Sequence, residues 1–128
     1  MSDPTLPVLG VDGLTAESEA TDDGIAVHFR GSADLTTQEQ LKEFLKKMHE
    51  EVLRRHGRRV AVDFVNLEFM NSSCFKTFLT WIHDVQNVAA EKRYHVTFLS
   101  NESLHWQKRS LNALRCFAVD LITVQQAR

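Results

Sequence analysis

The chain has 128 residues, of which 43% are hydrophobic and 25% charged, and 15 basic against 17 acidic side chains give a formal net charge of −2. This composition predicts one globular domain whose core needs no metal or disulfide. The longest apolar run, from Cys116 to Val119, is far shorter than the ~20 residues of a membrane helix. The polar start of the chain lacks a signal-peptide pattern, and the near-neutral charge argues against nucleic-acid binding. Two widely spaced cysteines, Cys74 and Cys116, indicate reduced thiols in a cytoplasmic protein.

The first elements expected along the chain form a hairpin. Residues 1–13 contain both prolines and two of the five glycines, which predicts a loose lead-in with one edge strand, ahead of a single domain over residues 14–128. Residues 14–20 alternate weakly, and residues 24–31 are a β-favouring run between glycines. The turn-forming residues between these two segments predict a β-hairpin.

An amphipathic helix follows the hairpin. Apolar residues recur every three or four positions from Leu41 to Leu53, with charged residues on the other face, which predicts a helix. Glu or Gln three residues after Thr36 and Thr37 has the spacing of a capping box. Gly57 follows a basic last turn and is expected to adopt the left-handed cap conformation.

The second half of the chain alternates strands with helices. Residues 59–65 are a nearly continuous β-branched run, expected to be a strand buried on both faces. After a predicted turn over residues 66–71, a helix begins near Ser72 or Ser73, with an inward stripe from Phe75 to Ala89. The remaining elements are a strand over residues 94–99, a helix up to Cys116 and a strand over residues 119–124. This order predicts an α/β fold, with a mixed, largely parallel sheet, an initial hairpin and three to four helices packed on it.

The junction at Asn71, Ser72 and Ser73 is the most informative place for function. Ligands gather at the carboxyl ends of strands in open α/β sheets, where helices begin. A serine at a helix start can cap the unpaired backbone N–H groups, and the positive helix end would stabilise a phosphate on it. Capping alone is the commoner role of such serines.

The residues around this junction resemble a known family. Residues 60–75, from Val60-Ala61-Val62-Asp63 to Asn71-Ser72-Ser73-Cys74-Phe75, are similar to the signature of STAS domains, found in sulphate transporters and anti-sigma-factor antagonists. That signature is a hydrophobic strand ending in Asp-Leu-Ser, an apolar pair, and Asp-Ser-Ser-Gly or Asp-Ser-Thr-Gly at a helix start. Residues 27–36 resemble the family's upstream strand ending in Gly-Glu-Leu-Asp. The resemblance covers residues 24–124 and implies a STAS-like fold.

The resemblance implies a regulatory role without catalysis. Ser73, with Ser72 as the alternative, would be the phosphoacceptor of an anti-sigma-factor antagonist in a partner-switching pathway. The partners would be an anti-sigma factor that is a GHKL-type serine kinase, and a PP2C-type phosphatase, and a homodimer is compatible with this role. The partner surface would comprise Asp34, Thr36, Asn71, Ser72, Ser73 and Cys74.

Two departures from the family pattern leave other readings open. Asn71 stands where the family has Asp, and Cys74 where it has Gly. A scaffold or transporter-regulating subunit with constitutive interactions is therefore the second hypothesis. A small enzyme using Cys74 is the third, although no nucleophile elbow surrounds this residue.

The sequence shows neither a cofactor motif nor a metal motif. It lacks glycine-rich phosphate loops, and its six histidines have no metal-ligand spacing, so we expect neither cofactor nor metal. The basic run over residues 54–59 could meet acidic partners or phosphates, although a solvated cluster at a helix end explains it more simply. Trp81 and Trp106 are candidates for a partner surface if exposed, or for the core.

Overall fold

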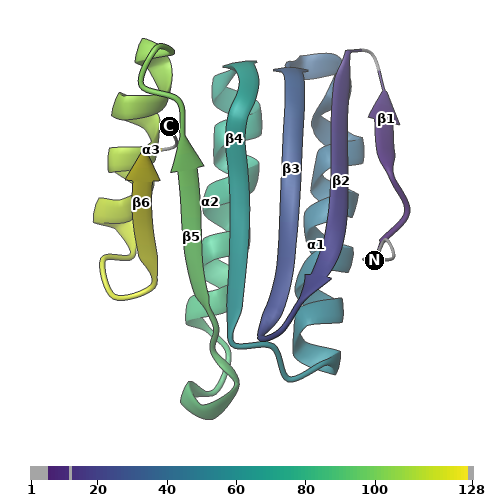
Figure 1. Ribbon diagram of the computed structural model, residues 1–128, viewed down its shortest axis with the longest axis vertical. Coiled ribbons are helices and arrows are strands. Elements are labelled where there is room, and N and C mark those ends of the chain that lie inside the picture. The colour runs from purple at the N-terminus through teal and green to yellow at the C-terminus, as the bar shows by residue number, and fades with distance from the viewer. Residues whose placement is uncertain (1–5, 12, 127–128) are drawn as a thin grey trace.

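The computed structural model describes residues 6–11 and 13–126. Strands and helices alternate after the initial hairpin, in the order that the sequence predicts (Figure 1). The strands are β1 (Leu9–Val11), β2 (Leu14–Thr21), β3 (Gly24–Ala33), β4 (Arg59–Met70), β5 (His95–Ser100) and β6 (Ile122–Gln126). The helices are α1 (Gln38–Arg54), α2 (Ser72–Gln86) and α3 (His105–Phe117), with two single 3₁₀ turns, η1 (Leu35–Thr37) and η2 (Ala90–Lys92).

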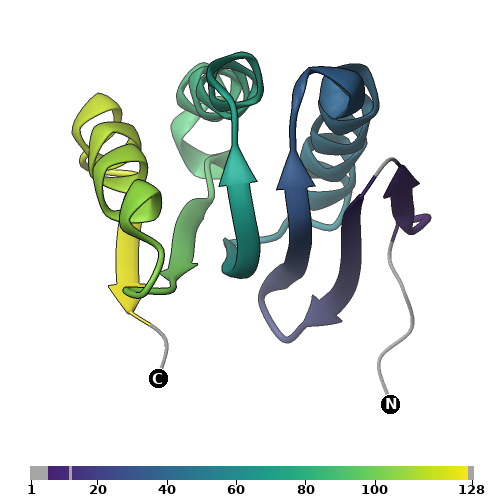
Figure 2. The same cartoon turned by 90° about the horizontal axis from the view of Figure 1, so that it is seen from above.

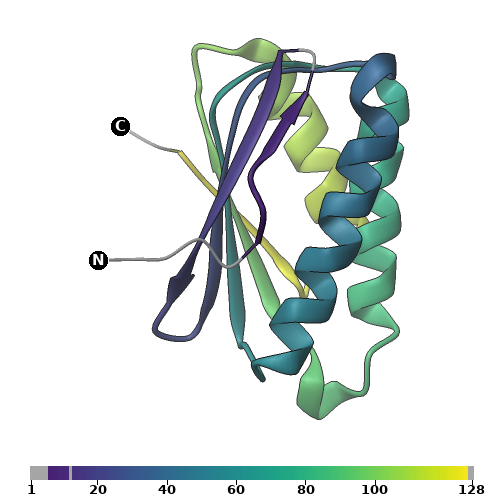
Figure 3. The same cartoon turned by 90° about the vertical axis from the view of Figure 1, so that its right-hand side faces the viewer.

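The strands form one six-stranded sheet in sequence order. β1, β2 and β3 pair antiparallel, and β3 to β6 pair parallel. Crossovers between parallel strands are right-handed in nearly all proteins. Because the strand order never reverses, such crossovers bring all three α-helices to the same face of the sheet, as Figures 2 and 3 show. The α/β prediction, with its initial hairpin and largely parallel sheet, is confirmed.

The core lies between the sheet and its three helices. On β4, Val60, Val62 and Phe64 face the helices and are buried, whereas Ala61 and Asp63 are only half-buried on the opposite face. None of the described helices covers that second face (Figure 3). The prediction that residues 59–65 are buried on both faces is therefore wrong, and the second face of the sheet is open.

β4 is longer than the sequence predicts. It pairs with β3 as far as Met70, so the predicted turn over residues 66–71 is wrong. The pairing shifts register between His28 and Arg30 and again between Gly31 and Ser32. Such bulges interrupt the alternation of buried and exposed side chains. The sequence pattern is therefore irregular here although the backbone remains a strand.

The two ends of α1 also differ from expectation. The side chain of Thr37 makes no capping bond to α1, and the capping box is formed one turn earlier, where Asp34 and Thr37 cap η1. The left-handed residue after the helix is His56, with φ 57°, and not Gly57. A Cβ at Gly57 would lie 3.0 Å from Cγ1 of Val52, so glycine avoids a tight contact there.

The inward stripe of α2 agrees with the prediction over most of its length. Phe78, Ile82 and Val85 are buried, and Trp81 joins them in the core. Ala89, the last residue of the predicted stripe, is exposed beyond the end of the helix.

A fully buried polar residue of α3, Gln107, holds the second half of β4. Its Nε2 donates to the carbonyl oxygens of Phe64 (2.6 Å) and Leu67 (3.0 Å), and its Oε1 accepts from the backbone N–H of Asn101 (2.7 Å). The pairing of β4 with β5 ends at Asp63, so these two carbonyls lie beyond the ladder. Gln107 supplies the partners that β5 does not.

Candidate functional site

Two loops meet at the carboxyl ends of β3 and β4, at the upper end of the sheet in Figure 1. Ala33 and Met70 are paired at the ends of the two strands, and the backbone N–H of Asn71 donates to the carbonyl oxygen of Ala33 (2.9 Å). The loop that starts at Asp34 and the start of α2 at Asn71 are therefore direct neighbours, although 37 positions separate them in the sequence.

The loop after β3 is ordered by the Asp34 side chain. Its Oδ1 accepts from the backbone N–H of Thr36 (3.0 Å) and from the Thr36 hydroxyl (2.7 Å). The Thr37 hydroxyl bonds the backbone of Asp34, accepting from its N–H at 3.1 Å and donating to its carbonyl oxygen at 2.9 Å. Asp34 is thus a capping residue, with Thr36 exposed beside it.

Asn71 is the N-cap of α2. Its backbone is extended, and its side-chain oxygen accepts from the backbone N–H of Cys74 (2.8 Å). Ser72 and Ser73 are therefore the first two residues of the helix, and neither hydroxyl is hydrogen-bonded to another described residue. Ser72 is exposed and Ser73 is half-buried. Because the Asn71 side chain already caps α2, the two serines are not needed as caps.

Cys74 joins the two loops from inside. Its side chain is fully buried, and its Sγ donates to the carbonyl oxygen of Asp34 (3.3 Å). Burial raises the pKa of the thiol, and the negative charge of Asp34 adds to this effect, although the Thr37 side chain lowers the pKa in part. The expectation that Cys74 lies on the partner surface is therefore not met, because its side chain faces the core. A buried neutral thiol is also a poor nucleophile, which argues against the enzyme hypothesis.

Sequence reasoning missed two exposed apolar residues beside these loops. Leu35, next to Asp34, has 68% of its surface exposed, and Phe69, near the end of β4, has 48%. They are two of the five large hydrophobic residues that are exposed in the described part of the chain. Leu35 lies outside the apolar stripe of α1, and this position in the sequence was the signal that could have indicated its exposure. Trp106, by contrast, is half-buried, and its ring N–H bonds the carbonyl oxygen of Glu68 (2.8 Å).

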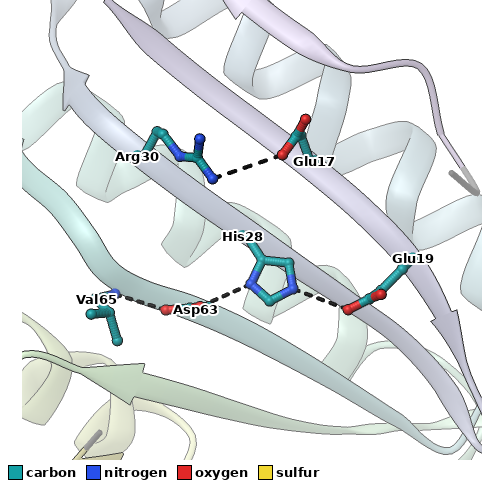
Figure 4. A network of polar contacts seen from close by, with 6 residues as sticks. All are labelled: Glu17, Glu19, His28, Arg30, Asp63 and Val65. Atoms are coloured by element: carbon teal, nitrogen blue, oxygen red, sulfur yellow. Dashed lines mark hydrogen bonds and ion pairs between the residues drawn. The ribbon is translucent and has the colours of Figure 1, made fainter. Parts of the chain in front are cut away.

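The open face of the sheet carries a polar network that the sequence analysis did not predict (Figure 4). His28 lies between two carboxylates, with Nδ1 2.8 Å from Asp63 and Nε2 3.2 Å from Glu19. Partial burial alone would lower the pKa of His28, but the hydrogen bonds and charges of Asp63 and Glu19 outweigh it and raise the pKa. Arg30 and Glu17 form a longer ion pair alongside, at 3.8 Å. This network stabilises the sheet where helices do not cover it.

The described residues contain neither a metal-binding cluster nor a membrane-spanning helix. Within residues 6–11 and 13–126, no three His, Cys, Asp or Glu side chains are grouped so that they could hold a metal ion. Over the same ranges, no helix has both the length and the apolar character needed to cross a membrane.

The comparison with known proteins is informative at the level of solved structures. No protein-family model matches the sequence, and no curated protein does. A solved structure matches, the crystal structure of an anti-sigma factor antagonist from Mycobacterium paratuberculosis, with a TM-score of 0.65 and 16% sequence identity. The match covers 91% of this chain and 88% of that chain.

The chain has a STAS-like fold. A six-stranded mixed sheet with an antiparallel start and three helices on one face agrees with this assignment. At such low identity, the likeness concerns the fold and does not transfer the antagonist's partners.

Proposed function

We propose that this chain is a non-enzymatic regulatory binding domain that acts as an anti-sigma-factor antagonist in a partner-switching pathway. In this proposal the unmodified protein binds an anti-sigma factor that is also a serine kinase, and phosphorylation at Ser73 or Ser72 releases it. One observation carries the proposal. The hydroxyls of Ser72 and Ser73 make no hydrogen bond to another described residue, and they lie at the start of α2, directly beside the Asp34 loop. The fold of an anti-sigma factor antagonist supports it.

The start of α2 is chemically suited to carry a phosphate. Backbone N–H groups and the helix dipole favour negative charge at a helix N-terminus. Lys76, exposed four residues after Ser72 and three after Ser73, is at the spacing of a side-chain pair on a helix. A phosphate on either serine would therefore be stabilised by the fold rather than disrupt it. Ser72 is the more accessible acceptor because Ser73 is half-buried.

The surroundings of the serines are suited to binding a partner protein. Leu35, in η1 after β3, and Phe69, near the end of β4, expose large apolar surface at this end of the sheet. Exposed apolar groups next to polar ones are typical of protein interfaces, whose cores are depleted of charge. Asp34 and Thr36 would form the polar part of the same surface.

A phosphate on this surface would act by charge. It adds about −1.5 to −2 at neutral pH, against a net charge of −2 for the whole chain. A partner that covers Leu35 and Phe69 would have to desolvate that charge, which lowers affinity without a change of fold.

The proposal is tested with the protein, a GHKL-type serine kinase encoded near its gene, and ATP. We expect one phosphate, located at Ser73 or Ser72 by mass spectrometry, and loss of modification when both are replaced by alanine. Thr80, an exposed hydroxyl two turns along α2, provides the control, because Thr80→Ala should leave modification unchanged. An active kinase that modifies neither serine would refute the switch.

Affinity measurements separate the switch from the scaffold alternative. Ser72→Asp and Ser73→Asp introduce a charge at each candidate, and the switch predicts at least about tenfold weaker partner binding for one of them, about 1.4 kcal/mol. Unchanged affinity for both would favour a constitutive scaffold or transporter-regulating subunit.

A further inference from the structure

The end of the sheet opposite the candidate site contains a cleft lined by arginines. The parallel strands β4 and β5 begin here, at the lower end of Figure 1. Arg58, just before β4, and Arg59, its first residue, meet Arg93, from the connection between η2 and β5, around a hollow of about 740 Å³. Asp23 and Asp120 are the carboxylates of its lining. The basic run over residues 54–59 is visible in the sequence, but only the fold brings it beside Arg93.

The backbone around these arginines is fixed by hydrogen bonds. The N–H groups of Arg58 and Arg59 both donate to the carbonyl oxygen of Asp23, at 2.7 and 3.1 Å, and the N–H of His95 donates to the carbonyl oxygen of Arg58 at 2.9 Å. These bonds tie the turn of the hairpin to the starts of β4 and β5. The arginines therefore project from a rigid frame and not from a loose loop.

The three arginine side chains differ in the contacts that they already make within the protein. Nε of Arg59 pairs with Asp23 at 3.1 Å. One terminal nitrogen of Arg93 donates to the carbonyl oxygens of Gln86 and Val88, at 3.0 Å each, which holds its guanidinium in position. Arg58 is exposed and makes neither an ion pair nor a side-chain hydrogen bond with another described residue. The cleft thus combines the Arg93 guanidinium, which hydrogen bonds hold in position, with the Arg58 guanidinium, which has no partner among the described residues.

The balance of charge in the cleft indicates the class of ligand. Three guanidinium groups face two carboxylates, so the lining is positive on a chain whose net charge is negative. Guanidinium groups bind phosphate and carboxylate oxygens through paired N–H donors. The volume falls within the range of about 300–1,000 Å³ of small-molecule sites.

We propose that this cleft binds a small phosphorylated molecule, with Arg58 and Arg93 contacting the phosphate. A phosphate is favoured over a single carboxylate because its second charge and extra oxygens can use guanidinium groups that approach from two connections. Asp120, which makes no ion pair with another described residue, opposes this binding. The inference is independent of the proposed role of Ser72 and Ser73, which lie at the other end of the sheet.

Titration of the full chain with inorganic phosphate and with glycerol 3-phosphate, followed by two-dimensional amide NMR, tests this site. We expect saturable shifts at Arg58, Arg59 and His95. Arg58→Ala should weaken binding about tenfold, as loss of a charge-assisted contact does, and Asp120→Asn should strengthen it. Equal affinity for both probes would indicate a site for phosphate itself, and tighter glycerol 3-phosphate binding a site that also contacts the organic part.

A matched control is available on α3. Arg109 is exposed and does not line the cleft, so Arg109→Ala should leave both affinities within about twofold, as for a screened surface charge. Arg93→Ala removes the backbone contacts as well, so its thermal unfolding is measured beside its affinity. Shifts that do not saturate, or affinities that Arg58→Ala and Asp120→Asn leave unchanged in folded protein, would overturn the proposal.

Discussion

Replacing Gln107 by leucine should destabilise the fold strongly although the two side chains are similar in size. The change removes three hydrogen bonds and leaves two carbonyl groups, of Phe64 and Leu67, and the N–H of Asn101 without partners. At ~1.5 kcal/mol for each group the loss is ~4–5 kcal/mol. Burial of the leucine side chain returns ~2 kcal/mol. We therefore expect the free energy of unfolding to fall by ~2–3 kcal/mol, out of ~5–15 kcal/mol for a typical domain.

Urea unfolding followed by circular dichroism measures this change, and thermal unfolding should show a Tm lower by ~10 °C. Lys108→Ala, at the exposed neighbouring position, controls for the helix itself. Gln107→Glu separates hydrogen bonding from packing. A buried carboxyl that faces two carbonyl oxygens has a raised pKa, so this variant should lose stability as pH rises and recover some of it in acid, where the protonated group can donate. If Gln107→Leu changes the unfolding free energy by less than ~0.5 kcal/mol, the inferred role of Gln107 is incorrect.

Three further predictions concern the caps, the open face and the thiols. Asn71→Ala should cost ~1 kcal/mol in urea unfolding by removing the N-cap, whereas Asn71→Asp should not. The raised pKa of His28 means that its bonds to Asp63 stabilise the fold fully below its ordinary pKa of 6.5 and lose this effect as pH rises through the folded value. Wild type should therefore exceed His28→Gln in stability by more at about pH 6 than at about pH 9, and an equal difference would contradict this. A thiol reagent at about pH 8 should label exposed Cys116 and spare buried Cys74, as peptide mapping would show; labelling of both at one rate would not fit.

The sequence predicted the order of elements because hydrophobic periodicity reports which face of each element is buried. The stripes of α1 and α2 and the hairpin could be identified in this way. The extension of β4 to Met70 could not, because it depends on bulged pairing with β3. Likewise, only the folded structure shows that Gly57 lies close to Val52 while His56 adopts the left-handed conformation.

The helix start at the candidate site was predictable from the sequence, but the orientation of the side chains around it was not. The motif at Asn71 to Ser73 indicated a helix start, and the structure brings the Asp34 loop beside it. That Cys74 faces inward and that Phe69 faces outward follow from tertiary packing, which a single sequence does not specify. The His28 network depends on strand register, and a slip of one residue would reverse every side chain of the strand.

The hydrogen bond from Asn71 to Ala33 makes the surface at this end of the sheet conformational rather than linear. A protein that contacts both the Asp34 loop and the first turn of α2 recognises two segments that lie side by side only when β3 and β4 are paired. An unfolded or truncated chain would carry the same residues but not that epitope. A partner of this kind would therefore bind folded molecules and not nascent or damaged ones, so its binding would also report that the chain is correctly folded.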